Sequence, residues 1–363
     1  MVAINRRSRC YQAGFTLVEL MVGLAIGMIA TVVIIQVMSV FEAQRRSTAG
    51  SANAQTNGGI ALNAIVREAQ MAGYPLFPAT DSPMECTTLT FGATSIASIV
   101  PVTITDGVAT AGVSASDRIT IRYGTSAIGG APTVITAMGG SAAQLNSNLG
   151  CQANDITLTS TGTTCAMSSA TAVSAAGVTP ITVTLQNTTA AVAGANLACL
   201  GAWNEVTYAV NPATGNLDRT SVVNGVSTTT PSVVGVVNLQ AQYGISASAN
   251  NNTIAQWVDA SGATWGAPTV ANRKRIKAIR IAVVARNDKL EMSNITNVCS
   301  STTVAAAAPS PETTGLCAWT GSATSPAPTI DLGPGDANWR RYRYRVFETI
   351  IPLRNVIWSK DTL

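Results

Sequence analysis

The chain has 363 residues, of which 11% are charged, and it contains no histidine. Without histidine, neither a Ser-His-Asp or Cys-His catalytic site nor a histidine-ligated metal site can form. The net charge of +4 falls to +1 (4 − 3) without Arg6, Arg7 and Arg9, so charge gives no argument for nucleic-acid binding. The abundance of Ala, Thr, Ser and Gly is typical of a secreted or surface-exposed, β-rich protein, and we expect neither an enzyme nor a cofactor.

The first predicted element is an apolar helix over residues 15–41, where Glu19 is the one ionisable side chain and no proline occurs. A helix of this length extends about 40 Å, which exceeds the hydrocarbon core of about 30 Å. The preceding residues carry Arg6, Arg7 and Arg9 but no acid, and the positive-inside rule places such an end in the cytoplasm. The pattern predicts a single membrane-spanning helix with the remaining chain in the periplasm.

Glu19 is unusual within this helix, because a carboxylate in a spanning segment costs on the order of 2–3 kcal/mol unless it is paired. A position close enough to the interface to stay solvated is the alternative. An ordinary secretory signal is disfavoured, because no small-x-small cleavage site follows the apolar run. A plain signal anchor explains the hydrophobicity but not the spacing of Gly14, Phe15 and Glu19.

The heptapeptide from Gly14 to Leu20, Gly-Phe-Thr-Leu-Val-Glu-Leu, follows a short basic leader. It closely resembles the processing site of type IV prepilins and type II secretion pseudopilins. The resemblance implies that a prepilin peptidase cuts between Gly14 and Phe15 and methylates the new amine of Phe15. It also implies that Glu19 pairs with the N-terminal amine of a neighbouring subunit and sets the register of assembly.

Helical spacing continues beyond the membrane, with Ile60, Ala64 and Met71 among the recurring apolar residues. We expect Asn57-Gly58-Gly59 to interrupt this helix, and Gly73-Tyr74-Pro75 to end it. The second half of the helix would then lay an apolar stripe against a folded head. Its last residues, Met-Ala-Gly-Tyr after Arg67, resemble the helix end of PilW-type minor pilins.

Short alternating patterns predict strands in the rest of the chain, both in the Ala/Thr/Ser/Gly-rich middle and in the last third. They fall at residues 117–123, 155–159, 181–185, 205–210, 217–219 and 278–286, with a turn at 211–216. Residues 233–245 are expected to form a further strand or a short helix. The blocks 238–244, 279–286 and 345–355 resemble the C-terminal half of PilW-type minor pilins. The middle resembles no family that we can name.

Seven cysteines are present, and Cys10 would be lost with the leader. An even set in an oxidising compartment predicts disulfides, whose connectivity a sequence leaves open. We favour Cys151–Cys165 and Cys299–Cys317, because each of these pairs closes a short loop. Cys86 and Cys199 then remain as the third pair. Zinc is the competing interpretation, but the chain has no Cys-x-x-Cys pair, and we expect no metal.

The basic and aromatic run at residues 339–345 could stack on and neutralise single-stranded DNA. In a strand, however, Arg341, Arg343 and Arg345 would share one face, with Tyr342 and Tyr344 on the other. We favour this ordinary solvated strand and expect no nucleic-acid partner.

The predicted fold is α+β and pilin-like, with a long N-terminal helix packed on an antiparallel β head. The segments are a cleaved leader (1–14), a membrane and filament-core helix (15–41), the periplasmic half of that helix (42–74) and a β-rich head with a variable middle (75–363). The resemblance, over 14–74 and 205–355, implies a PilW-type minor pilin in the inner membrane and then in the pilus at the cell surface.

Such a subunit joins other minor pilins and the major pilin in a tip or priming complex, with a tip adhesin among the implied partners, and supports motility, adhesion or DNA uptake. The alternatives are a J-type pseudopilin of a type II secretion system and a periplasmic domain on an uncleaved anchor.

Overall fold

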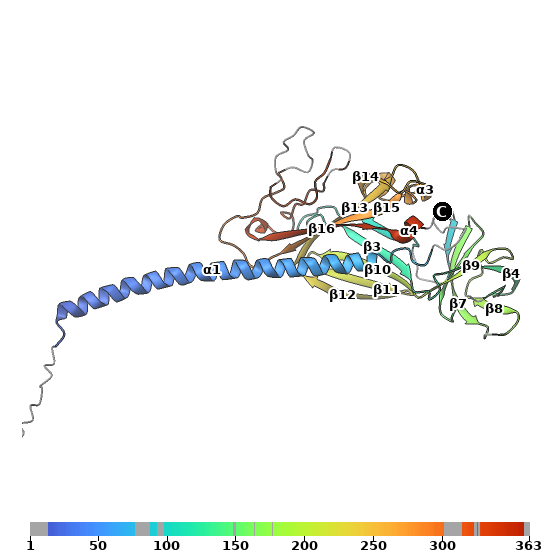
Figure 1. Cartoon of the computed structure of the whole chain (residues 1–363), viewed down its shortest axis with the longest axis horizontal. Coiled ribbons are helices and arrows are strands. Elements are labelled where there is room, and N and C mark those ends of the chain that lie inside the picture. Colours follow the sequence, from blue (N-terminus) through green and yellow to red (C-terminus); the bar gives the residue numbers. More distant parts are fainter. Residues whose placement is uncertain are drawn as a thin grey trace, which may run out of the picture. The chain divides into compact units, whose positions relative to one another are not determined.

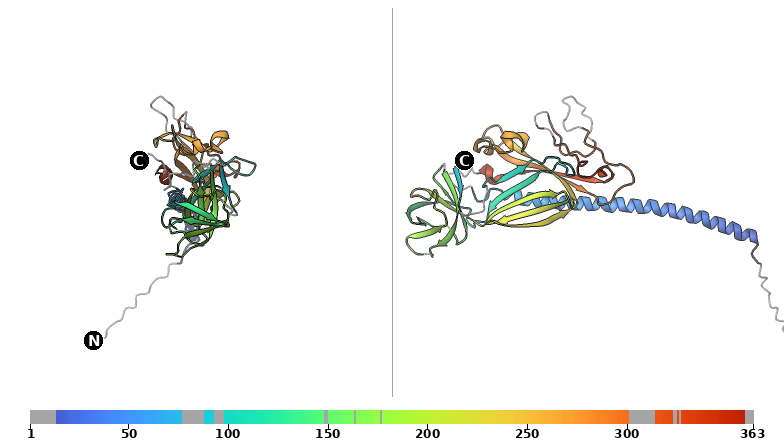
Figure 2. Two further views of the ribbon diagram at one scale, coloured as in Figure 1. Left: turned by 90° about the vertical axis from the view of Figure 1, so that its right-hand side faces the viewer. Right: turned by 180° about the vertical axis from the view of Figure 1, so that it is seen from behind.

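The computed structural model describes residues 14–76, 88–92, 98–147, 150–162, 164–175, 177–300, 314–322, 325 and 327–358. The chain forms two compact units, the first ending at Gly50 and the second beginning at Ser51. Figures 1 and 2 show the elements of both.

The described part of the first unit, residues 14–50, is helical from Leu17 onward. Helix α1 spans Leu17–Ala69, and its segment Leu17–Glu42 has a mean hydropathy of 2.5 with none of it buried. This segment is long and apolar enough to cross a membrane. The helix does not break at Asn57-Gly58-Gly59, so the interruption expected there is wrong, and regular helix ends at Ala69, four residues before Gly73.

The second unit, the head, contains two antiparallel sheets that share a core with the end of α1. The five-stranded sheet has the order β12-β11-β10-β3-β2, and the four-stranded sheet has the order β14-β13-β15-β16. Ala61, Ile65 and Ala69 of α1 are fully buried in one cluster with residues of both sheets, such as Ile121 and Ile281. The head therefore covers the side of the helix that carries Ala61, Ile65 and Ala69. Ile60 and Met71, which the predicted stripe included, are exposed, so the stripe is wrong at these two positions.

The predicted patterns correspond to β3, β10, β11, β13 and β15, whereas β2, β14 and most of β12 were not predicted. β13 and β15 are buried along almost their whole length, so their burial does not alternate. The strands of the two sheets are β2 (Val102–Thr105), β3 (Arg118–Gly124), β10 (Trp203–Asn211), β11 (Asn216–Val223), β12 (Val226–Val234), β13 (Val236–Ser246), β14 (Ile254–Asp259), β15 (Ile276–Arg286) and β16 (Tyr344–Pro352). The short helices are α2 (Gly262–Trp265), α3 (Val270–Arg273), η2 (Trp339–Arg341) and α4 (Arg354–Trp358).

The six strands of a closed β-barrel, β4 to β9, are inserted between β3 and β10, which are themselves paired neighbours in the five-stranded sheet. A further strand, β1, comes before β3 in the chain and pairs with β7. The barrel sheet has the order β1-β7-β6-β9-β4-β5-β8, and β8 also pairs with β7, which closes the ring. Figures 1 and 2 show its strands gathered together in every view. The strands are β1 (Thr88–Phe91), β4 (Thr133–Gly139), β5 (Ala142–Leu145), β6 (Ile156–Ser160), β7 (Thr164–Val173), β8 (Ile181–Leu185) and β9 (Asn196–Gly201).

Strand pairing in the barrel is antiparallel except for β1, which runs parallel to β7. The expectation of an antiparallel head is thus met by both other sheets but not by this pair. From residue 125 to 201 the chain carries one charged side chain, Asp155, and no aromatic residue. The cluster around Ile135 consists of aliphatic and cysteine side chains, whereas the cluster around Leu158 also contains Trp203, with Phe91 packed against it.

Candidate processing and assembly site

The peptide bond between Gly14 and Phe15 lies in non-helical backbone just before α1 begins at Leu17. Both residues are exposed, and the side chain of Phe15 is 88% accessible. A bond inside a helix is protected by its hydrogen-bonded turns, whereas exposed irregular backbone is where proteases act. The geometry leaves this bond open to a peptidase.

Glu19 and Thr16 form a capping box at the start of α1. The backbone N–H and the hydroxyl of Thr16 both donate to Oε2 of Glu19, at 2.9 Å each. In return, the backbone N–H of Glu19 donates to Oγ1 of Thr16 at 3.2 Å. Two backbone donors of the first turn are thereby satisfied, and Glu19 has a partner within its own chain. The spacing Thr-x-x-Glu is typical of a capping box and could have predicted this pair from the sequence, but the role of Thr16 was not predicted.

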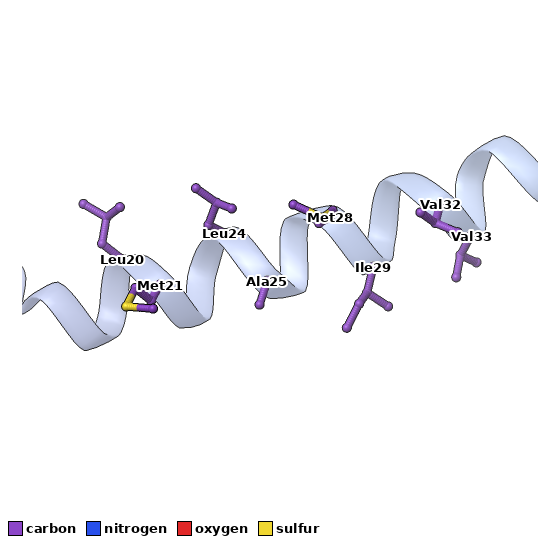
Figure 3. Close-up of a pocket in the computed structure, with 8 residues that line it drawn as sticks. All are labelled: Leu20, Met21, Leu24, Ala25, Met28, Ile29, Val32 and Val33. Carbon is purple, nitrogen blue, oxygen red and sulfur yellow. The ribbon is translucent and has the colours of Figure 1, made fainter.

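An apolar surface follows directly after the capping box. Figure 3 shows eight side chains that line a shallow groove on the bare helix: Leu20, Met21, Leu24, Ala25, Met28, Ile29, Val32 and Val33. Water-exposed apolar surface of this extent marks a membrane or protein contact. The first unit therefore needs either lipid or other helices around it.

The opposite end of α1 is fixed to the head by polar contacts. Nε and Nη2 of Arg219 on β11 both donate to Oε1 of Glu68, at 3.0 and 2.7 Å. The hydroxyl of Tyr208 lies 3.5 Å from the carbonyl oxygen of Ala64, and burial raises the pKa of this tyrosine. Asn355 donates from Nδ2 to the carbonyl oxygen of Ala72 at 3.0 Å. These contacts hold the end of the helix in the head.

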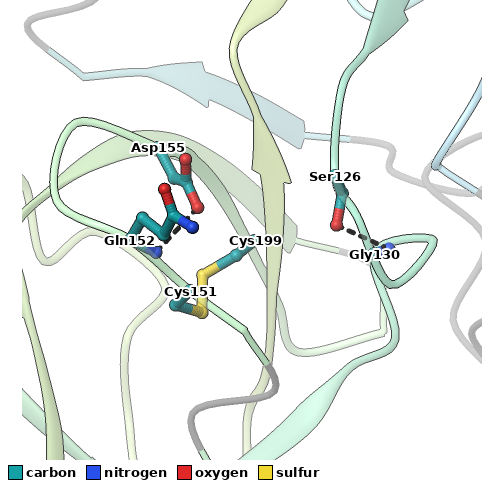
Figure 4. The surroundings of a disulfide bond; sticks show 6 residues. All are labelled: Ser126, Gly130, Cys151, Gln152, Asp155 and Cys199. Atoms are coloured by element: carbon teal, nitrogen blue, oxygen red, sulfur yellow. Dashed lines mark hydrogen bonds between the residues drawn. A yellow bond between two sulfur atoms is a disulfide. The ribbon is translucent and has the colours of Figure 1, made fainter. Parts of the chain in front are cut away.

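Two disulfides have both partners in the described residues. Cys299 pairs with Cys317, as expected from the sequence. Cys151 pairs with Cys199, so the expected pairs Cys151–Cys165 and Cys86–Cys199 are both wrong (Figure 4). Cys86 itself lies outside the described residues.

The pairing of Cys151 follows from which core each sulfur faces. Cys151 and Cys199 are buried in the cluster around Ile135, whereas Cys165 is buried in the cluster around Leu158. The short sequence separation favoured pairing Cys151 with Cys165. The sheet, however, directs the side chains of these two residues into different cores. Cys165 is also disulfide-bonded.

The arginines of the basic and aromatic run are engaged within the head. Nε of Arg341 donates to the carbonyl oxygen of Glu291 at 2.8 Å, and Nε of Arg343 donates to its Oε1 at 2.7 Å. The alternating strand expected from residue 341 is wrong at its start, because Arg341 belongs to the 3-10 helix η2 and β16 begins at Tyr344. Among the described residues, no group of three or more Cys, Asp or Glu could hold a metal ion.

Two family models match the chain. The model of type IV pilus-assembly protein W, PilW, matches residues 207–355, and the model of the prokaryotic N-terminal methylation motif matches residues 9–35. Together the two matches support a PilW-family type IV pilin. The methylation motif covers Gly14, Phe15 and Glu19, which supports a prepilin leader at this end of the chain. No curated protein and no solved structure matches the chain.

The matches support a minor pilin related to type IV pilus assembly, and the PilW family is one of structural pilins. A prepilin leader implies processing by a prepilin peptidase and assembly with other pilins. The apolar segment Leu17–Glu42 is consistent with membrane anchoring before assembly. Every strand of the barrel sheet precedes residue 207 and lies outside the PilW match.

Proposed function

We propose that this PilW-family chain is a minor pilin of a tip or priming complex, in which it contacts other minor pilins and the major pilin. The observation that carries the proposal is the single helix Leu17–Ala69, exposed and apolar in its first half and buried in the head in its second. Such an element joins a folded head to a membrane and then to a bundle of like helices. We infer a pilin-like arrangement from this division of the helix.

Processing would convert the start of the helix into a charged pair. Cleavage after Gly14 frees the amine of Phe15, and both this ammonium and the Glu19 carboxylate are costly in lipid. They neutralise each other when two subunits dock in the correct stagger. Until then the capping box with Thr16 gives the carboxylate two hydrogen bonds.

The orientation that we propose places residues 1–14 in the cytoplasm and the head in the periplasm before assembly, by the positive-inside rule. The two disulfides support this side for the head, since such bonds persist in oxidising compartments. Motility, adhesion or DNA uptake would depend on the assembled pilus.

Mass spectrometry of the protein from its native membrane tests the processing step. We expect a mature chain that begins with N-methylated Phe15, and a chain that retains Arg6, Arg7 and Arg9 would contradict the proposal. A deletion strain tests the assembly role: loss of pili with normal exoprotein secretion supports a minor pilin. Normal piliation with lost secretion would instead indicate a J-type pseudopilin.

A further inference from the structure

The head contains a polar cleft of about 400 Å³ that the assembly function does not use. It lies where β3 begins, at the turn between β10 and β11, and beside the segment before η2. The residues that matter for its chemistry are Ser114, Arg118, Thr214, Arg286, Asp336 and Tyr344. We call this the polar cleft. Its volume is in the range of small-ligand sites.

One of its two arginines is already neutralised. Nη1 of Arg286 lies 3.0 Å from Oδ2 of Asp336, and both side chains are about a quarter to a third exposed. The guanidinium also stacks over Tyr342, with Cζ 4.3 Å from the ring centroid. Arg286 is thus held in place and forms a fixed wall of the polar cleft.

The second arginine, Arg118, is exposed and has no hydrogen-bond or ion-pair partner in the described parts of the chain. Its neighbour Asp117 is buried on the opposite face of β3, where its carboxylate accepts from the backbone N–H groups of Gly107 and Ala241. Alternation along the strand therefore separates the two charges. Arg118 gives the polar cleft a net charge of +1, since Arg286 and Asp336 cancel.

Two hydroxyl groups of the polar cleft can donate to a ligand. The Oγ of Ser114 accepts from the backbone N–H of Gly335 at 3.2 Å, which leaves its own proton for a ligand. Thr214 is exposed, and within the described residues its hydroxyl has no partner. A site with a free guanidinium fork and free hydroxyl donors suits an anionic acceptor group.

We propose that the polar cleft binds the carboxylate of an acidic side chain on a peptide segment, with Arg118 as its bidentate partner. A peptide fits better than a sugar acid, because Tyr344 is the one aromatic residue lining the cleft and is half-buried, with its hydroxyl donating to the carbonyl oxygen of Trp339. Val108 and Val113 at the rim provide apolar contact for the stem of such a side chain.

The test uses the full chain in detergent micelles and measures binding by saturation-transfer NMR and calorimetry. The probes are acetyl-Ala-Asp-Ala-amide, its Asn analogue and glucuronic acid. We expect the Asp peptide to bind about tenfold tighter than the Asn peptide, as a charge-assisted hydrogen bond predicts. Added salt should weaken the binding of the Asp peptide but not that of the Asn peptide, because salt screens the charge of the exposed Arg118.

Arg118→Gln should reduce the affinity for the Asp peptide to that for the Asn peptide. Lys289→Gln is the matched control: Lys289 is exposed, pairs with Asp288 at 3.2 Å and lies outside the polar cleft, so binding should not change. The proposal would be overturned if the two peptides bound equally well, or if Arg118→Gln left the affinity for the Asp peptide unchanged. It would also be overturned if no probe bound, or if glucuronic acid bound more tightly than the Asp peptide.

Discussion

Gly58 of α1 lies directly against the aromatic ring of Phe347 on β16, and a Cβ atom added at Gly58 would overlap that ring. The next residue, Gly59, has no atom within 4 Å of the same position. A glycine costs a helix about 1 kcal/mol relative to alanine. The close approach of helix and strand explains why a glycine is needed at position 58. It does not explain the glycine at position 59.

Gly58→Ala should therefore lower the free energy of unfolding by about 1–3 kcal/mol, because the added methyl overpacks the contact with Phe347. Gly59→Ala should raise it by about 1 kcal/mol through helix propensity alone. Urea unfolding of the full chain in detergent, followed by tryptophan fluorescence, measures both. A Gly58→Ala variant as stable as Gly59→Ala would show that the contact with Phe347 does not decide stability.

The sequence predicted the elements whose signals are local. The alternation at residues 117–123, 155–159 and 181–185 corresponds to β3, β6 and β8, and the pattern at 211–216 corresponds to the turn between β10 and β11. The apolar run after Gly14 likewise became the exposed part of α1. In each case the period of the apolar residues suffices, because it follows from which face is buried.

What the sequence could not predict depends on contacts between distant residues. Closure of the barrel requires β8 to pair with β7 as well as β5, and nothing within either strand encodes that choice. The pairing of Cys151 with Cys199 depends on the same sheet, since it decides which core each sulfur enters. The sequence predicted a helix break at Gly58, because helix propensity takes no account of the packing of this residue against Phe347.

Asp117 is buried at the start of β3 and joins two parts of the head. Oδ1 accepts from the N–H of Gly107 at 3.0 Å, and Oδ2 accepts from the N–H of Ala241 on β13 at 2.7 Å. Burial, reinforced by the nearby Asp106 and Asp259, raises the pKa of this carboxyl to about 7. The folded protein then holds a proton that the unfolded chain releases near pH 4.

The free energy of unfolding should consequently fall as the pH rises from about 4 to 7, because the native state binds more protons in this window. In Asp117→Asn this slope should be smaller by up to about 1.4 kcal/mol per pH unit. The variant should also be less stable by about 1–3 kcal/mol at low pH, since the amide leaves one backbone N–H without an acceptor. Urea unfolding at several pH values measures both effects, and an unchanged slope in Asp117→Asn would contradict the titration of Asp117.

Gly14→Arg should block removal of the leader, because a large charged side chain replaces the residue beside the scissile bond in otherwise open backbone. Immunoblots and mass spectrometry of the membrane fraction should find the precursor with residues 1–14 attached. Gly59→Ala serves as a control for expression and insertion, since it lies far along the sequence from the cleavage site. Efficient cleavage of Gly14→Arg would remove Gly14 from the processing site.

Glu19 has two separable tasks, capping the helix and pairing with a neighbouring subunit. Glu19→Gln keeps a capping box, because Gln also accepts at this position, but removes the charge. Thr16→Ala removes the cap and keeps the charge, at a cost of about 1 kcal/mol in helix stability. Glu19→Gln and Glu19→Ala should both be made, inserted and cleaved, because the proposed pairing with the amine of another subunit acts only during assembly.

Their recovery in sheared filaments should fall about tenfold or more, because an ammonium left unpaired in an apolar bundle costs on the order of 2–3 kcal/mol. Thr16→Ala should be recovered at close to the normal level, since its carboxylate can still meet the amine of a neighbour. Quantitative immunoblots of filaments against whole cells provide the measurement. Loss of Thr16→Ala together with normal recovery of Glu19→Gln would assign the importance of this site to the capping box, and the proposed pairing between subunits would then be wrong.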